Sequence, residues 1–278
     1  MRPLRPALIL LVASLATACN GGAPVTLTFA GLVGGQPAAC GTTYSGVGST
    51  ATDLELEDFR LYVHDVRLVT ESGEEVAVTL DDDDWQVDDI ALLDFEDGTA
   101  GCESGNPGTN ATVRGTVPDG SGPFVGVRFR LGVPFDRNHA DASTAPAPLS
   151  FGSMFWSWNL GYKFLRVDAR TTGLPEGWLL HLGSTGCEGD GRGNVSGCAA
   201  DNIVDVELTG FDPASDTIAV DLADVLSGAD LDVNAGGAPG CQSGVDDTDC
   251  GPVFDGLGLS FAGTPPSGPQ RLFSIRAP

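Results

Sequence analysis

Short runs of alternating apolar and polar residues, separated by Gly and Pro, extend along most of the chain. The clearest is Phe124–Val133, where Val125, Val127, Phe129 and Leu131 occupy every second position. A period of two places these side chains on one face of a β-strand. Similar runs rich in β-branched and aromatic residues predict further strands at Val25–Phe29, Leu54–Val69, Glu75–Leu80, Ala111–Val117, Lys163–Ala169, Trp178–Leu182, Ile203–Leu208, Thr217–Val220 and Leu272–Ile275.

Helical periodicity is weak and is confined to Asp221–Leu226 and Ile90–Leu93. Many short strands with turn signals between them are typical of an antiparallel β-sandwich. We therefore expect an all-β, sandwich-like single domain over residues 25–278, with long disulfide-closed loops.

The N-terminus has the features of a secretory signal. Arg2 and Arg5 precede an apolar run that is too short to span a bilayer as a mature helix. The small residue Ala18 stands directly before Cys19, as in a bacterial lipobox, although Leu in place of Ala16 would match better. We expect a lipoprotein signal over residues 1–19, a lipid on Cys19, a linker over residues 20–24, and a periplasmic or surface protein anchored to the outer membrane. The alternative is ordinary cleavage near this point, without a lipid.

The rest of the chain contains six cysteines, and an even number in an exported chain indicates disulfides. Two pairs bracket short loops, one rich in Gly and one acidic, and the remaining two cysteines are left for each other. Other pairings are open, because the choice depends on proximity alone. The expected disulfides are Cys40–Cys102, Cys187–Cys198 and Cys241–Cys250.

The net charge of −24, from 38 acidic and 14 basic residues, argues against nucleic acid as a partner. The acidic runs Asp81–Asp84 and Asp246–Asp249 lack the alternating ligands and closing Glu of a calcium loop, so we expect solvated loops. The chain has no HExxH motif, P-loop, dinucleotide fingerprint, nucleophile elbow or CxxCH haem site. An exported hydrolase therefore has little support.

Candidate metal ligands are few. The three histidines are His64, His139 and His181, and a lone histidine is more often structural than a ligand. His139 differs in its surroundings, since Asn138 precedes it and the thioether of Met154 follows nearby. Imidazole and thioether suit copper, and neutral imidazole also suits zinc.

An aromatic stripe follows this Asn-His pair. Met154, Trp156 and Trp158 would share one face of a strand, and Lys163, the only lysine, lies just beyond them. The simplest interpretation is an aromatic wall of the core with Lys163 extending from its edge. That interpretation accounts for burial, but it does not account for the neighbouring imidazole and thioether.

Several sequence blocks, in the expected order, together resemble the MbnP family, the four-Cys motif proteins of metallo-mystery pair systems. The resemblance extends from about Leu54 to Leu259, and any single block alone would be weak. The blocks are Leu61–Leu68, Leu131–His139, Pro148–Leu149, Met154–Trp158, Gly161–Phe164 and His181–Cys187. The four-Cys motif would consist of Cys187, Cys198, Cys241 and Cys250.

The resemblance implies a copper-binding protein of copper homeostasis, which is a substrate of an enzyme and is not itself an enzyme. Its implied partner is a MauG-like di-haem peroxidase that oxidises a tryptophan to kynurenine, which then joins the copper ligands. The candidates for modification are Trp158, Trp156 and Trp85. The candidate ligands are His64, His139 and His181, with Met154 as a weak donor.

The competing hypothesis is a structural or adhesive surface lipoprotein without a metal site. In that protein the aromatic stripe would be core, and replacing His139 or His181 by Ala would leave the metal content unchanged. A metal-binding protein would lose metal with the same substitutions.

Overall fold

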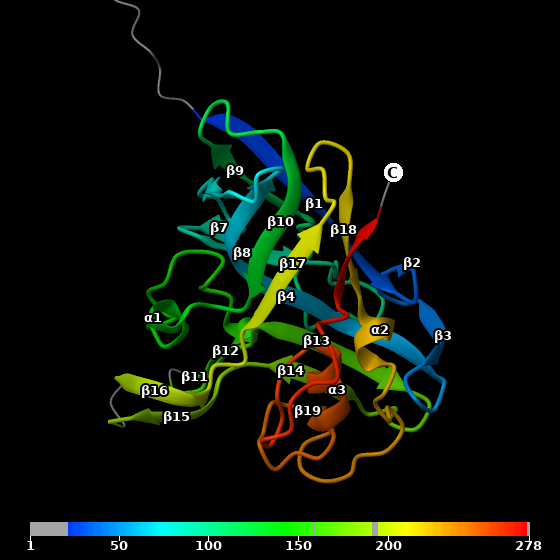
Figure 1. The fold of residues 1–278 in the computed structure, drawn as a ribbon. Helices are drawn as coiled ribbons and strands as arrows, with labels where there is room; N and C mark the ends of the chain where they lie inside the picture. Colours follow the sequence, from blue (N-terminus) through cyan, green and yellow to red (C-terminus); the bar gives the residue numbers. More distant parts are fainter. Residues whose placement is uncertain (1–21, 158, 191–193, 277–278) are drawn as a thin grey trace, which may run out of the picture.

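The computed structural model describes residues 22–157, 159–190 and 194–276 (Figure 1). The expected signal, Cys19 and Trp158 therefore lie outside the described residues. In the described part of the chain, no helix is both long and apolar enough to cross a membrane.

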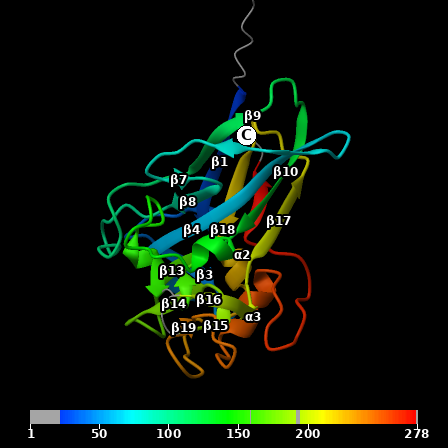
Figure 2. The same cartoon turned by 90° about the vertical axis from the view of Figure 1, so that its left-hand side faces the viewer.

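Two β-sheets form the body of the protein (Figures 1 and 2). The smaller sheet has six strands, and β1 at its centre pairs with β18 and β9. Its strands are β20 (Phe273–Arg276), β18 (Thr217–Asp221), β1 (Ala23–Val33), β9 (Thr112–Val117), β6 (Thr79–Leu80) and, paired with β1, β2 (Gln36–Pro37).

The larger sheet is organised around β4, the longest strand, which pairs with five other strands. Its main path is β17 (Val204–Thr209), β10 (Phe124–Leu131), β4 (Thr52–Thr70), β13 (Leu165–Thr171), β14 (Trp178–Leu182) and β19 (Gly240–Cys241). Beside this path lie β3 (Thr43–Val47), β5 (Glu75–Ala77), β7 (Gln86–Val87) and β8 (Ile90–Asp94).

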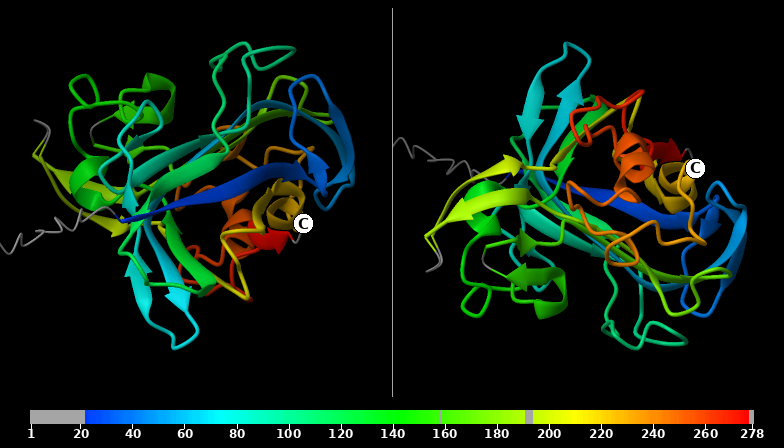
Figure 3. Two further views of the ribbon diagram at one scale, coloured as in Figure 1. Left: turned by 90° about the horizontal axis from the view of Figure 1, so that it is seen from above. Right: turned by 90° about the horizontal axis from the view of Figure 1, so that it is seen from below.

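Small elements cover the edges of this body. Two hairpins form separate two-stranded sheets, and the second of them projects from the body (Figures 1 and 3). They are β11 (Phe155–Ser157) with β12 (Gly161–Tyr162), and β15 (Thr185–Gly189) with β16 (Val195–Ala200). The helices are α1 (Phe135–Asn138), the 3-10 helix η1 (Gly152–Met154), α2 (Leu222–Leu226) and α3 (Cys250–Gly256).

The hydrophobic core lies between the two sheets. The ring of Phe129 on β10 packs edge-on against Phe29 of β1 and Phe273 of β20, with centroids 5.8 and 5.0 Å apart. Burial of such side chains is the main favourable term in folding. The all-β sandwich is therefore confirmed, although the pairs β1–β18 and β14–β19 are parallel and the others antiparallel.

The far face of the larger sheet is unusually polar for a buried surface. Alternate side chains of β4 point away from the core, and residues 58–64 are buried on both faces. Strand register places Arg60, Arg166 and His181 side by side on this outer face, and Phe59, Val167 and Leu180 side by side on the core face. We call the first set of positions, with Asp58, Asp168 and His64, the polar face.

Three sequence expectations need correction. Ile90–Leu93 is a strand and not a helix, because β8 is buried along its whole length and shows no alternation. Glu75–Leu80 is divided at Val78 into β5 and β6, which join different sheets. Met154 belongs to the helix η1, so it does not share a strand with Trp156.

The three expected disulfides are confirmed as Cys40–Cys102, Cys187–Cys198 and Cys241–Cys250. The Cys187–Cys198 bond joins opposite residues of β15 and β16, so the segment expected as a loop is a hairpin.

Candidate metal centre

His181 lies on β14 within the polar face and is only 6% exposed. Its Nε2 is 2.6 Å from Oδ1 of Asp168 on the adjacent strand β13. If Nε2 carries the proton and donates it to this carboxylate, Nδ1 presents a lone pair. Nδ1 is buried and has no hydrogen-bond partner among the described residues, which is rare for a buried polar atom.

A chain of buried charges holds Asp168 in position. Arg166 donates from Nε to Asp168 at 3.0 Å and lies 3.1 Å from Asp58 through Nη1, and Asp58 pairs with Arg60. Burial alone would raise the pKa of Asp168, but hydrogen bonds from His181 and Arg166 and the charge of Arg166 lower it to about 2. Burial lowers the pKa of His181, and the opposing effect of Asp168 is smaller, so the imidazole is neutral at neutral pH.

Trp156 covers this imidazole. The Trp156 and His181 ring centroids are 6.0 Å apart, and Trp156 is only partly buried. Gly183 allows the approach, since a Cβ there would lie 2.6 Å from Cζ3 of Trp156. Nζ of Lys163 lies 6.0 Å from the Trp156 ring centroid and donates to the carbonyl of Ser153 at 2.9 Å.

Lys163 is partly buried, and its ammonium group lies over the Trp156 ring. Burial, followed by the nearby charge of Arg166, lowers the pKa of its ammonium group to about 8. A cation at this distance from an indole face is attracted by the ring quadrupole.

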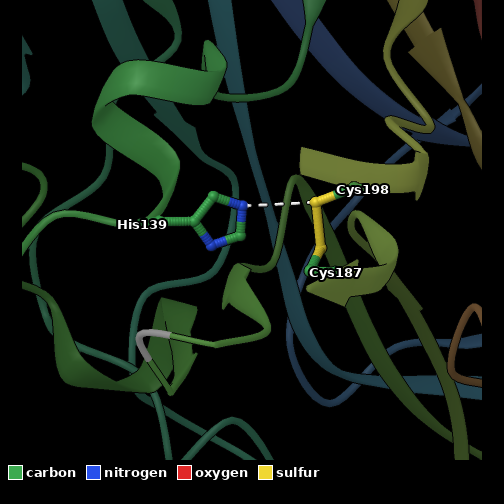
Figure 4. Close-up of side chains that lie close together, drawn as sticks. All are labelled: His139, Cys187 and Cys198. Atoms are coloured by element: carbon green, nitrogen blue, oxygen red, sulfur yellow. Dashed lines mark hydrogen bonds between the residues drawn. A yellow bond between two sulfur atoms is a disulfide. The ribbon is translucent and has the colours of Figure 1, made fainter. Parts of the chain in front are cut away.

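His139 follows helix α1 and points toward the hairpin β15–β16 (Figure 4). Its Nε2 lies 3.2 Å from Nδ2 of Asn138 and 3.4 Å from Sγ of Cys198. Asn138 accepts the N–H of Tyr162 at 2.7 Å and donates to Oγ of Ser184 at 3.1 Å. These bonds fix the end of α1 against β12 and the segment that follows β14.

His64 is held on β4 by a hydrogen bond from Nδ1 to the carbonyl of Gly132 at 2.9 Å. It lines a pocket of about 390 Å³ together with Arg130, Ser184 and Asp201. Burial lowers the pKa of His64, so this imidazole is also neutral at neutral pH.

The three histidines occupy neighbouring but distinct environments. Ser184 connects them, because it lines the His64 pocket, bonds Asn138 beside His139, and follows His181 by three residues. Among the described residues, however, no group of three potential ligands with mutual distances within 4.8 Å contains more than one histidine. The two groups found are His139 with Cys187 and Cys198, and Cys40 with Glu96 and Cys102.

The remaining tryptophans differ in environment. Trp85 packs against Phe151 with centroids 5.9 Å apart, and no ring contact joins it to a histidine within the described ranges. Trp178 is 1% exposed and lies opposite Ala169 on the core face. Met154 is fully buried, in contact with the core cluster.

Sequence reasoning missed Asp168 and Arg166, the residues that orient His181. Both alternate with apolar residues on β13, which is the ordinary pattern of a solvent-facing strand. Their burial depends on the cover supplied by other segments, and nothing local in the sequence indicates it.

Comparison with known proteins agrees with this architecture. The family model described as MbnP matches residues 22–243, a range that includes all three histidines. Among solved structures, MbnP from Methylosinus trichosporium is similar, with 33% sequence identity and a TM-score of 0.81 over 92% of this chain and 99% of that chain. No curated protein matches the chain. From the family match and the structural match together, the chain belongs to the MbnP family.

Proposed function

We propose that this protein binds copper in a centre built on His181 beside Trp156. The observation that carries the proposal is the buried Nδ1 of His181, which has no hydrogen-bond partner in the described part of the chain although Asp168 holds Nε2. A histidine whose second nitrogen is bound to a carboxylate is the usual arrangement of a metal ligand, because the carboxylate orients the ring and raises its basicity.

The donors in this region suit copper better than a hard cation. The imidazole of His181 is neutral because burial lowers its pKa, so its lone pair is available at neutral pH. Imidazole nitrogen and thioether sulfur favour copper over calcium or magnesium. The family resemblance adds His64 and His139 as candidate ligands and Met154 as a candidate weak donor.

We further propose that Trp156 is the tryptophan oxidised to kynurenine by a MauG-like di-haem peroxidase. Two features support Trp156: its ring contacts His181, and it is partly exposed to an external oxidant. In this conversion two equivalents of hydrogen peroxide, used by the peroxidase, cleave the indole C2–C3 bond to N-formylkynurenine and two waters. Hydrolysis then releases the C2 carbon as formate and leaves kynurenine, with an aniline nitrogen and a carbonyl group. Trp158 and Trp85 are the alternative positions.

In this proposal the protein acts in copper homeostasis as a binding protein and not as an enzyme. Its residues hold the metal, exclude water from Nδ1 of His181 and present Trp156 to the partner. It is exported and anchored through Cys19 to the outer membrane. Fatty-acid labelling of the wild type, lost in a Cys19→Ser variant, would test the anchor.

The decisive experiment is copper analysis and peptide mass spectrometry of protein isolated from its native host. We expect one copper per chain and kynurenine at Trp156, with copper lost in His181→Ala. Trp156→Phe should remove the modification, whereas Trp85→Phe, the matched control, should keep it. Unmodified tryptophans together with no copper in the wild type would instead favour the structural or adhesive lipoprotein.

A further inference from the structure

The hairpin β15–β16 brings two sulfur atoms and one imidazole together. Nε2 of His139 and the Sγ atoms of Cys187 and Cys198 all lie within 4.8 Å of one another. Figure 4 shows the imidazole pointing at the disulfide from the end of α1. While the disulfide is closed, neither sulfur is a thiolate, so this cluster cannot hold a metal through sulfur.

The distance between the sulfur and nitrogen atoms of this cluster matches that between two ligands of one metal ion, once the disulfide is opened. Metal–sulfur bonds of about 2.3 Å and metal–nitrogen bonds of about 2.0 Å at a tetrahedral angle place sulfur and nitrogen about 3.5 Å apart. Nε2 of His139 is already 3.4 Å from Sγ of Cys198. Cys187 and Cys198 are opposite residues in the hairpin, so both sulfurs stay on the same side after reduction.

This disulfide is also the most accessible of the three. Cys187 and Cys198 are both partly exposed, and Cys198 lines a surface hollow of about 330 Å³. Each other disulfide contains at least one fully buried cysteine. In the described parts of the chain, β15 and β16 pair only with each other, so opening their bond leaves both large sheets intact.

We propose that reduction of Cys187–Cys198 creates a second metal site, in which His139 and the two thiolates bind a soft or borderline metal ion such as Cu(I) or Zn²⁺. In the reduction, the Sγ–Sγ bond accepts two electrons and two protons from a dithiol reductant, which becomes a disulfide. Metal binding then displaces the two thiol protons. The hairpin is a redox-gated site, closed to metal in the disulfide state.

The ligand set determines the metal class. Two thiolates and one imidazole form a set used for zinc, and thiolate sulfur also selects Cu(I). The site differs from the centre proposed at His181, because it requires two thiolates, and therefore reduction, and does not use Nδ1 of His181. His139 is a candidate for both sites, so the cysteines and His181 distinguish them: Cys187→Ser/Cys198→Ser removes only this site, and His181→Ala removes only the other.

The other sulfur-containing cluster, Cys40, Glu96 and Cys102, is a weaker candidate. Its carboxylate already accepts hydrogen bonds from the backbone N–H groups of Gly98 and Asn106 at 2.8 and 2.9 Å. Cys102 is fully buried, so a reductant has poor access to this bond.

The test compares Cd²⁺ binding to the oxidised and the reduced mature chain, without oxygen. A small dithiol is added and removed, and thiol alkylation with peptide mass spectrometry identifies the bond that opened. We expect the reduced wild type to bind one Cd²⁺ more than the oxidised form, with thiolate-to-metal absorption in the near ultraviolet. The variant Cys187→Ser/Cys198→Ser should lose this additional ion.

The imidazole is tested with matched variants. His139→Ala should weaken Cd²⁺ binding by the reduced protein on the order of tenfold or more, because one of three ligands is lost. Asp141→Asn, which changes an exposed residue two positions after His139, should leave this binding unchanged. The proposal is overturned if reduced Cys187 and Cys198 bind no Cd²⁺, if His139→Ala binds it equally well, or if another disulfide opens while Cys187–Cys198 stays closed.

Discussion

The carboxylate of Asp168 decides which nitrogen of His181 is available to a metal. The short hydrogen bond to Oδ1 of Asp168 occupies Nε2 of His181, and Arg166 holds the carboxylate in place. The remaining nitrogen, Nδ1, then has a fixed direction as well as a lone pair. A ligand oriented in this way loses little conformational entropy on metal binding.

The first prediction tests this orientation. Asp168→Asn keeps the shape but removes the charge, and loss of such a partner typically weakens metal affinity on the order of 10–100-fold. Copper affinity measured against a competing chelator should fall by this factor. Glu57→Gln, which breaks the more exposed pair with Arg170, is the control and should leave the affinity unchanged. Equal affinities for both variants would remove Asp168 from the site.

A second prediction concerns Asp94, which is fully buried at the end of β8 and has an Oδ2 without a hydrogen-bond partner in the described chain. Burial, and then the nearby charge of Glu96, raises the pKa of Asp94 to about 8. In the folded protein Asp94 therefore keeps its proton to a higher pH than in the unfolded chain, where the pKa of an Asp carboxyl is about 3.9. The stability contributed by the protonated group is fully present below about pH 4 and is lost as the pH rises through 8.

Asp94→Asn should remove this dependence. The free energy of unfolding of the wild type should fall by up to about 1.4 kcal/mol per pH unit between these values from this group alone. Urea denaturation at pH 5 and pH 8 should give a smaller difference for Asp94→Asn than for the wild type. Asp119→Asn, on an exposed loop, should behave like the wild type. A wild-type-like difference in Asp94→Asn would contradict the prediction.

The sequence predicted which residue types take part in the candidate site better than it predicted which residues contact one another there. The three histidines and Trp156 are rare residues in this chain, so composition alone identifies them. The partner of His181, Asp168, is set by the register of β13 and β14, which places Arg166 directly opposite His181 and Asp168 two residues farther along the same face of β13. Strand register depends on the packing of the whole sheet, so it could not be derived from this single sequence.

At the scale of elements, strands that contain aromatic, β-branched or polar residues could be predicted, whereas a short unbroken apolar run and a Gly-rich hairpin could not. Trp178–Leu182 has the predicted bounds, and β10 begins at the predicted residue. Ile90–Leu93 failed because both of its faces are buried, and an unbroken apolar run does not distinguish a strand from a helix. The hairpin β15–β16 was missed because Gly, Ser and Cys give it no apolar alternation.

The two short-range disulfides allow a third prediction. Both close loops of similar length, with separations of 11 and 9 residues, so chain entropy gives each about 3 kcal/mol. Cys241 and Cys250 are fully buried and join β19 to α3, whereas Cys187 and Cys198 are partly exposed in the projecting hairpin. Replacing the buried pair by Ala also leaves a cavity.

Calorimetry should therefore show a larger loss of Tm for Cys241→Ala/Cys250→Ala than for Cys187→Ala/Cys198→Ala. The two double variants are matched in chemistry and in loop length, so the difference reports packing. Equal losses would mean that the hairpin contributes to global stability as much as α3 does.

On the scale of the whole molecule, the sandwich separates two kinds of burial. The space between the sheets contains the aromatic and aliphatic core, and the outer face of the larger sheet contains the charge chain from Asp58 to His181. The core supplies stability, since buried ion pairs are often no better than apolar side chains of the same volume. The charge chain supplies fixed geometry for the candidate metal centre.

The last prediction tests this division with two substitutions in one strand. Phe129 on β10 is 2% exposed and contacts rings from two strands of the smaller sheet, whereas Val125, four residues earlier, is 38% exposed. Phe129→Ala should lower the free energy of unfolding by about 3–5 kcal/mol, and Val125→Ala by less than about 1 kcal/mol. If the sheets and the polar face are energetically separate, Phe129→Ala will still bind copper like the wild type at temperatures where it is folded. A loss of copper in folded Phe129→Ala would show instead that contact between the two sheets sets the geometry of the metal centre.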